Sequence, residues 1–235
     1  MPRPVLVVTH AHCEQAALID VALGELPVLR RSILDEHDPG LPAVSDLAGV
    51  VVMGGPQDAN ADERYPGLRA ERRLLAEAVS ADVPVLGVCL GMQLLGVALG
   101  ARLHLRHGAE VGFLPIELTT AGAADPVVGA FAQHTTVLHW HSDAVELPAG
   151  TALLASTPTT PVQAFRIGSA LGTQFHPEAD AELLATWLTT SIMVEGLAPA
   201  ALARIRADGA ALLPGLRPVA LRGFAAFAAA VERRM

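Results

Sequence analysis

Apolar runs alternate with amphipathic stretches along the first hundred residues. Three of the runs are continuously apolar and rich in valine, namely 4–10, 47–56 and 83–89. Such runs are typical of strands in a parallel sheet that is buried on both faces. The stretches that follow them place apolar residues at helical spacing, over 13–24, 65–81 and 90–100. The alternation predicts an α/β fold, a mostly parallel sheet with helices on both faces.

The pattern changes after residue 101. Short apolar runs separated by Gly, Pro, Asp and Thr continue to about residue 175 and predict antiparallel additions, the last of which rejoins the main sheet. Residues 36–46 are expected to form a loop. Residues 179–235 are rich in Ala and Leu and predict helices, with breaks near Pro199, Pro214 and Pro218. We expect a single domain over residues 1–235, with 190–235 as a helical C-terminal extension.

Composition narrows the possible functions. The formal charge of −8 is spread along the chain, which does not fit the basic surface of a nucleic-acid-binding protein. All 16 basic residues are arginine, so the chain offers neither a Schiff-base lysine nor a lysine-containing phosphate loop. Any ATP-driven step would therefore lie on another chain. No apolar run reaches membrane-spanning length and no signal peptide is evident, so we expect a cytoplasmic protein without membrane contact.

Cys89 stands between an expected strand and an expected helix, in the stretch "GVCLG". Glycines two residues before and after it, Gly87 and Gly91, allow a tight turn where a Cβ would crowd the backbone. The turn would present the sulfur at the carboxyl edge of the sheet and at a helix N-terminus, which favours the thiolate. The stretch predicts a nucleophile, while a cysteine packed in the core is the alternative.

A thiol nucleophile needs a base, and the base needs a group that orients it. The segment "QFHPE" places His176 and Glu178 on the same side of an extended stretch, where the carboxylate can hold the imidazole. Acyl transfer also needs N–H donors for the developing oxyanion. The turn "MGGP" offers the N–H of Gly55, and Leu90, directly after the cysteine, offers a second.

The ordered motifs "GGP", "GVCLGMQLL" and "QFHPE" over residues 47–180 resemble those of class I (triad) glutamine amidotransferases. The resemblance implies a flavodoxin-like domain that hydrolyses the side-chain amide of glutamine through a thioester, without a cofactor. It implies Cys89 as nucleophile, His176 as base and acid, and Glu178 as its orienting carboxylate. Gly55 and Leu90 would form the oxyanion hole. The resemblance also assigns Gln93 to substrate binding. The segment "VLHWHSD" resembles the segment that lines the glutamine pocket in relatives of the GMP synthase glutaminase, which implies that His141, Ser142 and Asp143 bind the substrate as well.

Two histidine-rich segments, "THAHC" at 9–13 and "HWH" at 139–141, have spacings found among metal ligands. No third ligand can be identified for either, so no metal is expected. The leading hypothesis is a stand-alone glutaminase that delivers ammonia to an ATP-dependent synthetase on a separate chain. One alternative keeps the triad and acts on another γ-glutamyl compound. A second alternative is a catalytically idle binding protein.

Overall fold

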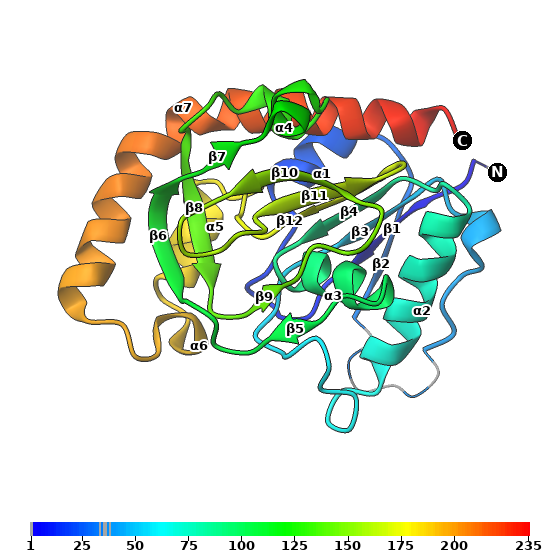
Figure 1. Ribbon diagram of the computed structural model, residues 1–235, viewed down its shortest axis with the longest axis horizontal. Helices are drawn as coiled ribbons and strands as arrows, with labels where there is room; N and C mark the ends of the chain where they lie inside the picture. The colour runs from blue at the N-terminus through cyan, green and yellow to red at the C-terminus, as the bar shows by residue number, and fades with distance from the viewer. Residues whose placement is uncertain (1, 33, 35–36, 38) are drawn as a thin grey trace.

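The computed structural model describes residues 2–32, 34, 37 and 39–235. Its central sheet contains eight strands. They are β1 (Val5–Val8), β2 (Val28–Arg31), β3 (Gly49–Val52), β4 (Val85–Val88), β7 (Glu117–Leu118), β10 (Ala152–Ser156), β11 (Ala164–Ile167) and β12 (Ala170–Thr173). The strand order is β2-β1-β3-β4-β12-β11-β10-β7, and it can be followed across the centre of Figure 1.

The first five strands in this order run parallel, and the remaining three continue antiparallel. The parallel order is that of flavodoxin-like sheets, and β12 rejoins the main sheet beside β4 as the sequence predicted. Strands β3, β4 and β12 are adjacent, so the segments that leave their carboxyl ends meet at one edge. That adjacency brings together the three motifs that are far apart in the sequence.

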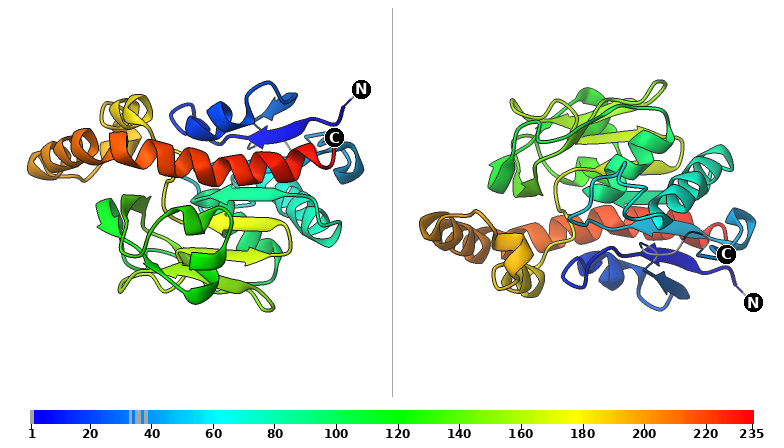
Figure 2. Two further views of the ribbon diagram at one scale, coloured as in Figure 1. Left: turned by 90° about the horizontal axis from the view of Figure 1, so that it is seen from above. Right: turned by 90° about the horizontal axis from the view of Figure 1, so that it is seen from below.

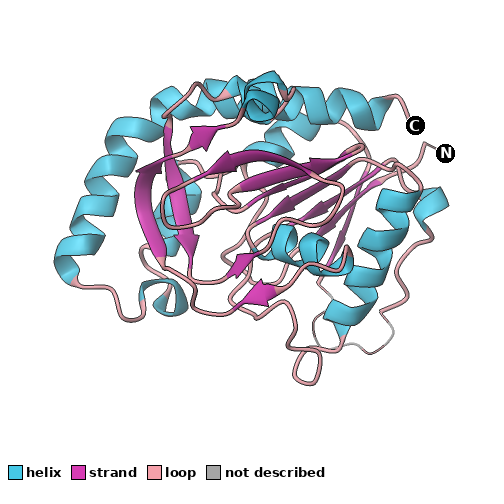
Figure 3. Ribbon diagram, in the orientation of Figure 1, coloured by secondary structure: helices cyan, strands magenta, loops and turns pink. Residues whose placement is uncertain are grey.

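Each face of the sheet has its own hydrophobic core, because the strand side chains alternate. In β1, Val5 and Val7 face helices α1 (Leu18–Leu23) and α7 (Pro199–Glu232), whereas Leu6 and Val8 face α2 (Gly67–Ser80) and α3 (Leu90–Ala98). Figures 1 and 3 show these helices on opposite sides of the strands. The predicted α/β fold with helices on both faces is confirmed.

Two small sheets and several short helices complete the structure. β5 (Leu103–His104) pairs with β9 (Ala144–Val145), and β6 (Glu110–Pro115) pairs antiparallel with β8 (Thr136–His141). The short helices are α4 (Thr120–Ala124), α5 (Ala181–Trp187) and α6 (Ser191–Val194), with 3-10 turns at Val44–Asp46 and Val128–Ala130. The β6–β8 pair stands at the left in Figure 1, next to the carboxyl ends of the parallel strands, and borders the site described below.

One expected boundary was wrong, and one predicted loop ends in a short 3-10 turn. Helix α1 begins at Leu18 rather than at residue 13, because the preceding segment is held by tertiary hydrogen bonds. The Cys13 carbonyl accepts a bond from the Trp187 indole at 2.7 Å, and Leu18 N donates to Glu178 O at 3.1 Å. In the predicted loop 36–46, positions 36 and 38 lie outside the described residues, and Val44–Asp46 forms a 3-10 turn.

Of the three expected breaks in the C-terminal helices, the one near Pro199 is confirmed, because α6 ends at Val194 and α7 begins at Pro199, whereas Pro214 and Pro218 do not interrupt helix α7. Pro199 occupies its first turn, where a missing N–H costs nothing, and Pro214 and Pro218 lie inside the continuous helix α7. Packing of Phe224, Phe227 and Val231 in the core compensates for the lost backbone bonds. Figure 1 shows α7 bending between its orange and red parts, and Figure 2 shows it running along most of the molecule. No helix in the described part of the chain combines the length and the apolar character needed to cross a membrane.

Candidate active site

Cys89 occupies a sharp turn between β4 and α3. Its backbone has φ 52° and ψ −106°, a strained conformation for a residue with a side chain, and its N–H donates to Thr173 O at 2.8 Å. A Cβ on Gly91 would lie 2.1 Å from Val52 O, and one on Gly87 would lie 2.6 Å from Gly91 O. The steric reason given for the two glycines is therefore confirmed.

His176 and Glu178 follow β12, on the strand next to the one that carries Cys89. The His176 Nδ1 and Glu178 Oε1 lie 2.8 Å apart, and both side chains are almost completely buried. His176 N donates to Leu138 O at 2.8 Å, and the Trp187 ring packs edge-on against the imidazole at 4.7 Å between ring centres. His176 Nε2 makes no well-aligned hydrogen bond with any described residue. The carboxylate thus fixes one ring nitrogen and leaves the other available.

Burial and the neighbouring charges set the protonation of the site. Burial raises the pKa of the Cys89 thiol, and the hydrogen bond and charge of His176 oppose that rise. Burial disfavours the His176 imidazolium too, but the charge of Glu178 and the interactions with Cys89 raise the His176 pKa well above its ordinary value. The positive charge that Glu178 favours on His176 stabilises the thiolate form of Cys89 against the effect of burial.

The turn after β3 places Gly55 directly against Leu90. A Cβ on Gly55 would lie 2.9 Å from Leu90 Cδ2 and 2.7 Å from His10 Cβ, so glycine permits this close approach. His10 links this turn to helix α2: its Nδ1 lies 3.1 Å from Gly54 O, and its Nε2 lies 3.0 Å from Glu71 Oε2. Burial opposes charge on His10, but Glu71 outweighs it and the pKa of His10 is raised.

A cavity of about 260 Å³ opens above the thiol. It brings together six of the residues singled out from the sequence, Gly55, Cys89, Gln93, His141, Ser142 and Asp143. Leu90, His176 and Glu178 are buried and are not among the residues that line it. Other parts of the wall come from the segment 192–197 and from the loop that contains Glu14. The cavity has the size of a small amino-acid-like ligand, and the thiol is exposed to it.

The four residues assigned to substrate binding differ in how many of their polar side-chain atoms already have hydrogen-bond partners. Gln93 Nε2 donates to Asp143 O at 3.3 Å and to Gln174 Oε1 at 3.1 Å. Both ring nitrogens of His141 are engaged, Nδ1 near Asp143 O at 3.2 Å and Nε2 near a glutamate at 3.0 Å, so His141 offers the cavity only its ring surface. Ser142 is exposed, and Asp143 Oδ1 accepts from the Arg106 N–H at 2.8 Å.

Glu14 is a site residue that sequence reasoning missed. It lines the cavity, is buried, and its Oε2 has no hydrogen-bond partner among the described residues. Burial raises its pKa to about 6, and the charge of Glu178 adds to that rise while His176 and His10 oppose it. Glu14 lies four residues after His10, but this spacing alone predicts no role, because the sequence does not show which groups the glutamate faces.

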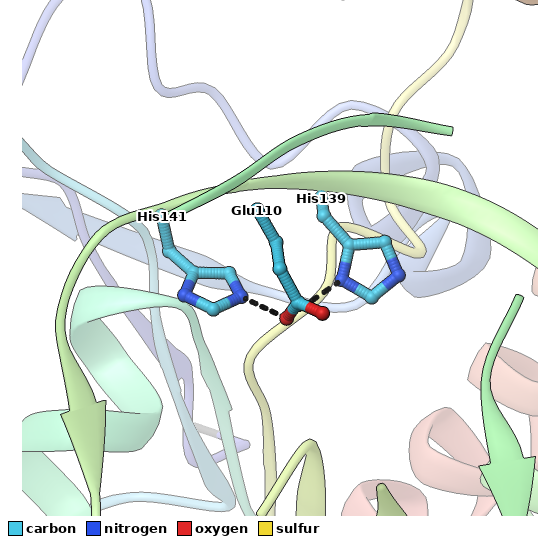
Figure 4. A group of neighbouring side chains, drawn as sticks. All are labelled: Glu110, His139 and His141. Carbon is cyan, nitrogen blue, oxygen red and sulfur yellow. Dashed lines mark hydrogen bonds and ion pairs between the residues drawn. The ribbon is translucent and has the colours of Figure 1, made fainter. Parts of the chain in front are cut away.

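The two histidine-rich segments have different environments. In "THAHC", His10 pairs with Glu71, His12 is exposed, and Cys13 is buried. In "HWH", both histidines face Glu110, which lies about thirty residues earlier in the chain and which sequence spacing could not reveal (Figure 4). Within the described residues, these are the side chains whose ligand atoms gather as a group of three.

The fold and the site together define the class of protein: a flavodoxin-like α/β domain with a cysteine, Cys89, at the turn between β4 and α3, at the carboxyl edge of the parallel sheet. A family model described as "Glutamine amidotransferase class-I" matches residues 25–191, and the chain belongs to that family. It is 31% identical to one subunit of the glutamine-hydrolyzing GMP synthase of Natronomonas pharaonis, over 76% of this chain and 89% of that protein.

Two further comparisons extend this picture. The chain is 37% identical to the glutamine amidotransferase-like protein YfeJ of Salmonella typhimurium, over 60% of this chain and 61% of that protein. The match therefore spans less than two thirds of YfeJ. The crystal structure of a glutamine amidotransferase from Methylobacillus flagellatus superposes with a TM-score of 0.87, covering 98% of this chain and 96% of that one at 24% identity. That likeness shows the fold.

Proposed function

We propose that this chain hydrolyses the side-chain amide of L-glutamine through a thioester on Cys89. One observation carries the proposal: a strained thiol faces a cavity beside a buried imidazole, and a carboxylate holds the other nitrogen of that imidazole at 2.8 Å. Structural roles do not require this combination, because a core cysteine needs neither the strained backbone nor a buried imidazole oriented by a carboxylate.

The first half of the reaction forms the thioester. The Cys89 thiolate attacks the amide carbon, and the carbonyl oxygen becomes an oxyanion that the N–H groups of Gly55 and Leu90 stabilise. The His176 imidazolium then gives its proton to the departing nitrogen, so ammonia leaves and the C–N bond breaks. Glu178 keeps the imidazole in the correct tautomer and balances its charge throughout.

The second half restores the enzyme. Neutral His176 takes a proton from water while the water oxygen attacks the thioester carbon. The C–S bond breaks and releases the thiolate beside the His176 imidazolium, and the new γ-carboxyl group gives up its remaining proton to solvent as glutamate leaves. Gln93, fixed by two hydrogen bonds, is positioned to contact the substrate, and Ser142 and Asp143 border the same space.

We infer that residues 1–235 act as one domain in this reaction, with 190–235 as its helical extension. Helix α7 supports this because Phe224 and Val231 are buried in the core of the central sheet. The ammonia would pass to an ATP-dependent synthetase on a separate chain. The Natronomonas relative is by its name one part of a glutamine-hydrolyzing synthase, and this chain has no lysine for a phosphate loop of its own.

The charge of the cavity favours a second candidate substrate class. Glu14, Asp143 and Glu195 all line it, and none of its described lining residues is an arginine. One carboxylate suffices for the α-ammonium of glutamine, and the others would attract a second positive charge. A γ-glutamyl amide whose leaving amine is cationic would use the same thioester chemistry, with the amine in place of ammonia.

The test of the proposed function measures glutamate release from L-glutamine and covalent labelling by a diazo-ketone analogue of glutamine. Cys89→Ala should reduce turnover by at least ~10⁴-fold and abolish labelling. Cys13→Ala is the matched control, because Cys13 is the other cysteine of the chain and lies outside the cavity lining. Unchanged turnover in Cys89→Ala would refute the mechanism. Absence of labelling in the wild-type protein would favour the idle binding protein.

A second measurement separates the two substrate classes. The rate constants kcat/KM for glutamine, γ-glutamyl-butylamine and γ-glutamyl-putrescine are compared, since the last two differ mainly in a terminal ammonium. The acid-lined cavity should favour the cationic amide by roughly tenfold over the neutral one, and added salt should weaken the preference. Equal rates for those two, both below the rate for glutamine, would leave glutamine as the substrate.

A further inference from the structure

Glu110, His139 and His141 face one another between strands β6 and β8. Glu110 is paired directly with His141 across the antiparallel ladder, and His139 is paired with Gly112, which contributes no side chain. Alternation along β8 puts the two histidines on the same side. Figure 4 shows both imidazoles turned toward the carboxylate. Glu110 Oε2 lies 3.0 Å from His141 Nε2 and 3.9 Å from His139 Nδ1.

The outer nitrogens of both imidazoles contact backbone carbonyl oxygens. His139 Nε2 lies 3.3 Å from Leu114 O, and His141 Nδ1 lies 3.2 Å from Asp143 O. A carbonyl oxygen can only accept, so the proton of each neutral imidazole sits on that outer nitrogen. The inner nitrogens of both rings face Glu110. A protonated His141 can donate to the carboxylate as His10 does to Glu71, but His139 Nδ1 lies 3.9 Å from it without a partner among the described residues, and a cation held by both rings and the carboxylate would satisfy that nitrogen.

Burial and neighbouring hydrogen bonds fix the positions of His139 and Glu110. The His139 side chain is fully buried, and its Nδ1 has no hydrogen-bond partner within the described structure. Thr157 Oγ1 donates to Glu110 Oε1 at 2.6 Å, and Gln163 Nε2 donates to Glu110 Oε2 at 2.5 Å, so neighbouring side chains fix the carboxylate. Backbone carbonyls and hydrogen-bonded carboxylates commonly orient metal-ligating side chains in this way.

We propose that Glu110, His139 and His141 bind a Zn²⁺ ion. Two imidazole nitrogens and one carboxylate oxygen are a common zinc ligand set, and imidazole disfavours Mg²⁺ and Ca²⁺. The three ligand atoms lie within 4.8 Å of one another, so zinc bonds of ~2.1 Å require only small side-chain movements. A water molecule would complete a tetrahedron, as is common for zinc with three protein ligands.

The ion would add a metal-mediated link between strands β6 and β8. Strand β8 carries Trp140, whose carbonyl oxygen lies 3.9 Å from the Cys89 sulfur, and leads into Ser142 and Asp143 in the cavity wall. Zinc at this position is therefore structural: it fixes the wall of the catalytic cavity without contacting the substrate. The site is separate from the thiol, so zinc content and glutaminase activity can be tested independently.

The primary test uses the full chain without a histidine tag. Metal analysis after dialysis against zinc and then buffer should find about one zinc per chain, and none retained from Mg²⁺. Zinc at about 100-fold over its Kd should raise Tm by roughly 5–10 °C over chelator-treated protein. Replacement by Co²⁺ should produce the intense visible absorption of a tetrahedral site. Less than ~0.1 zinc per chain with an unchanged Tm would overturn the proposal.

Paired variants locate the ion. His139→Gln should lose the zinc, whereas His104→Gln should keep it, since His104 forms an exposed pair with Glu146 on the surface. Cys89→Ala should retain one zinc per chain, which separates this site from the thiol and from the proposed function. Should His139→Gln fail to fold, the Co²⁺ spectrum of the wild-type protein decides. Zinc that remains in His139→Gln and disappears in Cys89→Ala would place the ion at the thiol and refute the assignment.

Discussion

Two buried regions of this molecule place a histidine about 3 Å from a glutamate, and they differ in what holds the rest of the ring. At the thiol, His176 Nδ1 contacts Glu178, and Nε2 makes no well-aligned bond to any described residue. Between β6 and β8, each outer nitrogen of His139 and His141 contacts a backbone carbonyl, and the inner nitrogens face Glu110. The first imidazole can exchange a proton with the neighbouring thiol, whereas the other two direct their inner nitrogens at one carboxylate.

The comparison teaches that the identity of a histidine–glutamate pair says little about its role. A ring oriented by a carboxylate, with one nitrogen available, suits general acid–base chemistry. Rings oriented by carbonyls, with a carboxylate at the focus, suit a cation. His10 contacts a carbonyl and Glu71 as His141 contacts a carbonyl and Glu110, but no third metal-ligating side chain joins the His10–Glu71 pair among the described residues, so that pair holds the adjacent turn.

The largest expected difference comes from removing the charge at each carboxylate. Glu178→Gln should lower kcat for glutamine by roughly 10³–10⁴-fold, since the imidazolium loses its counter-charge and its preferred tautomer. Glu110→Gln should change kcat by less than ~10-fold and instead lower zinc content and Tm. Steady-state kinetics and metal analysis on the same preparations check both outcomes.

The two glutamates act as controls for each other. Each is buried, and each lies about 3 Å from an imidazole, so nonspecific damage from a buried glutamine would affect both alike. Similar losses of kcat in the two variants would contradict the proposal that only Glu178 supports catalysis. A loss of zinc in Glu178→Gln would contradict the proposal that Glu110, and not Glu178, binds the ion.

The next effect concerns the His10–Glu71 pair, which should behave as a purely structural one. Glu71→Gln leaves a fully buried imidazolium without its counter-charge and should lower the free energy of unfolding by ~3–5 kcal/mol. The rate constant kcat should fall less, by roughly tenfold, as the Gly54–Gly55 turn loosens. Urea denaturation measures the first change, and glutamate release measures the second.

The pH dependence of that stability loss has a definite sign. The pKa of His10 is raised in the folded protein, so its pairing with Glu71 stabilises most below the ordinary histidine pKa of about 6.5. The advantage of the wild type over Glu71→Gln should decline as pH rises through the folded pKa. A difference that instead grows with pH would show that His10 is neutral in the fold.

The smallest expected effect is a shift of the pH profile by Glu14→Gln. Groups facing Glu14 include His10, His176 and Glu178, and its negative charge raises the pKa of the Cys89 thiol. Removing that charge should move the rising limb of kcat/KM toward lower pH by less than about one unit. Glu195→Gln, on the exposed rim of the same cavity, is the control and should leave the limb in place.

The sequence was informative where chemistry is local. The elbow glycines, the cysteine and the "HPE" segment each follow a strand that periodicity identifies, and β12 beside β4 brings them to one edge. The parallel sheet and its two helical layers follow from the same alternation. Parallel strands end at a common edge, so motifs placed after strands had to converge there.

Partners contributed from distant segments could not be predicted. Glu71 reaches His10 from the middle of α2, and Glu110 reaches His141 across a strand pair whose register the sequence does not specify. The start of α1 was wrong because a tertiary bond from Trp187 holds residue 13 outside the helix. Proline propensity failed in α7 because packing against the core outweighs two lost backbone bonds.

Helix α7 also constrains the order in which the protein can assemble. The helix presses against β3, where a Cβ on Gly49 would lie 2.7 Å from the Val231 side chain, and its Phe227 covers the same face. During synthesis the first strands emerge nearly two hundred residues before this cover exists. Until α7 has been synthesised, one apolar face of the sheet, which includes Val5, Val7 and Val51, lacks the helix that covers it. Aggregation through this exposed face therefore competes with folding until residues 199–232 are available.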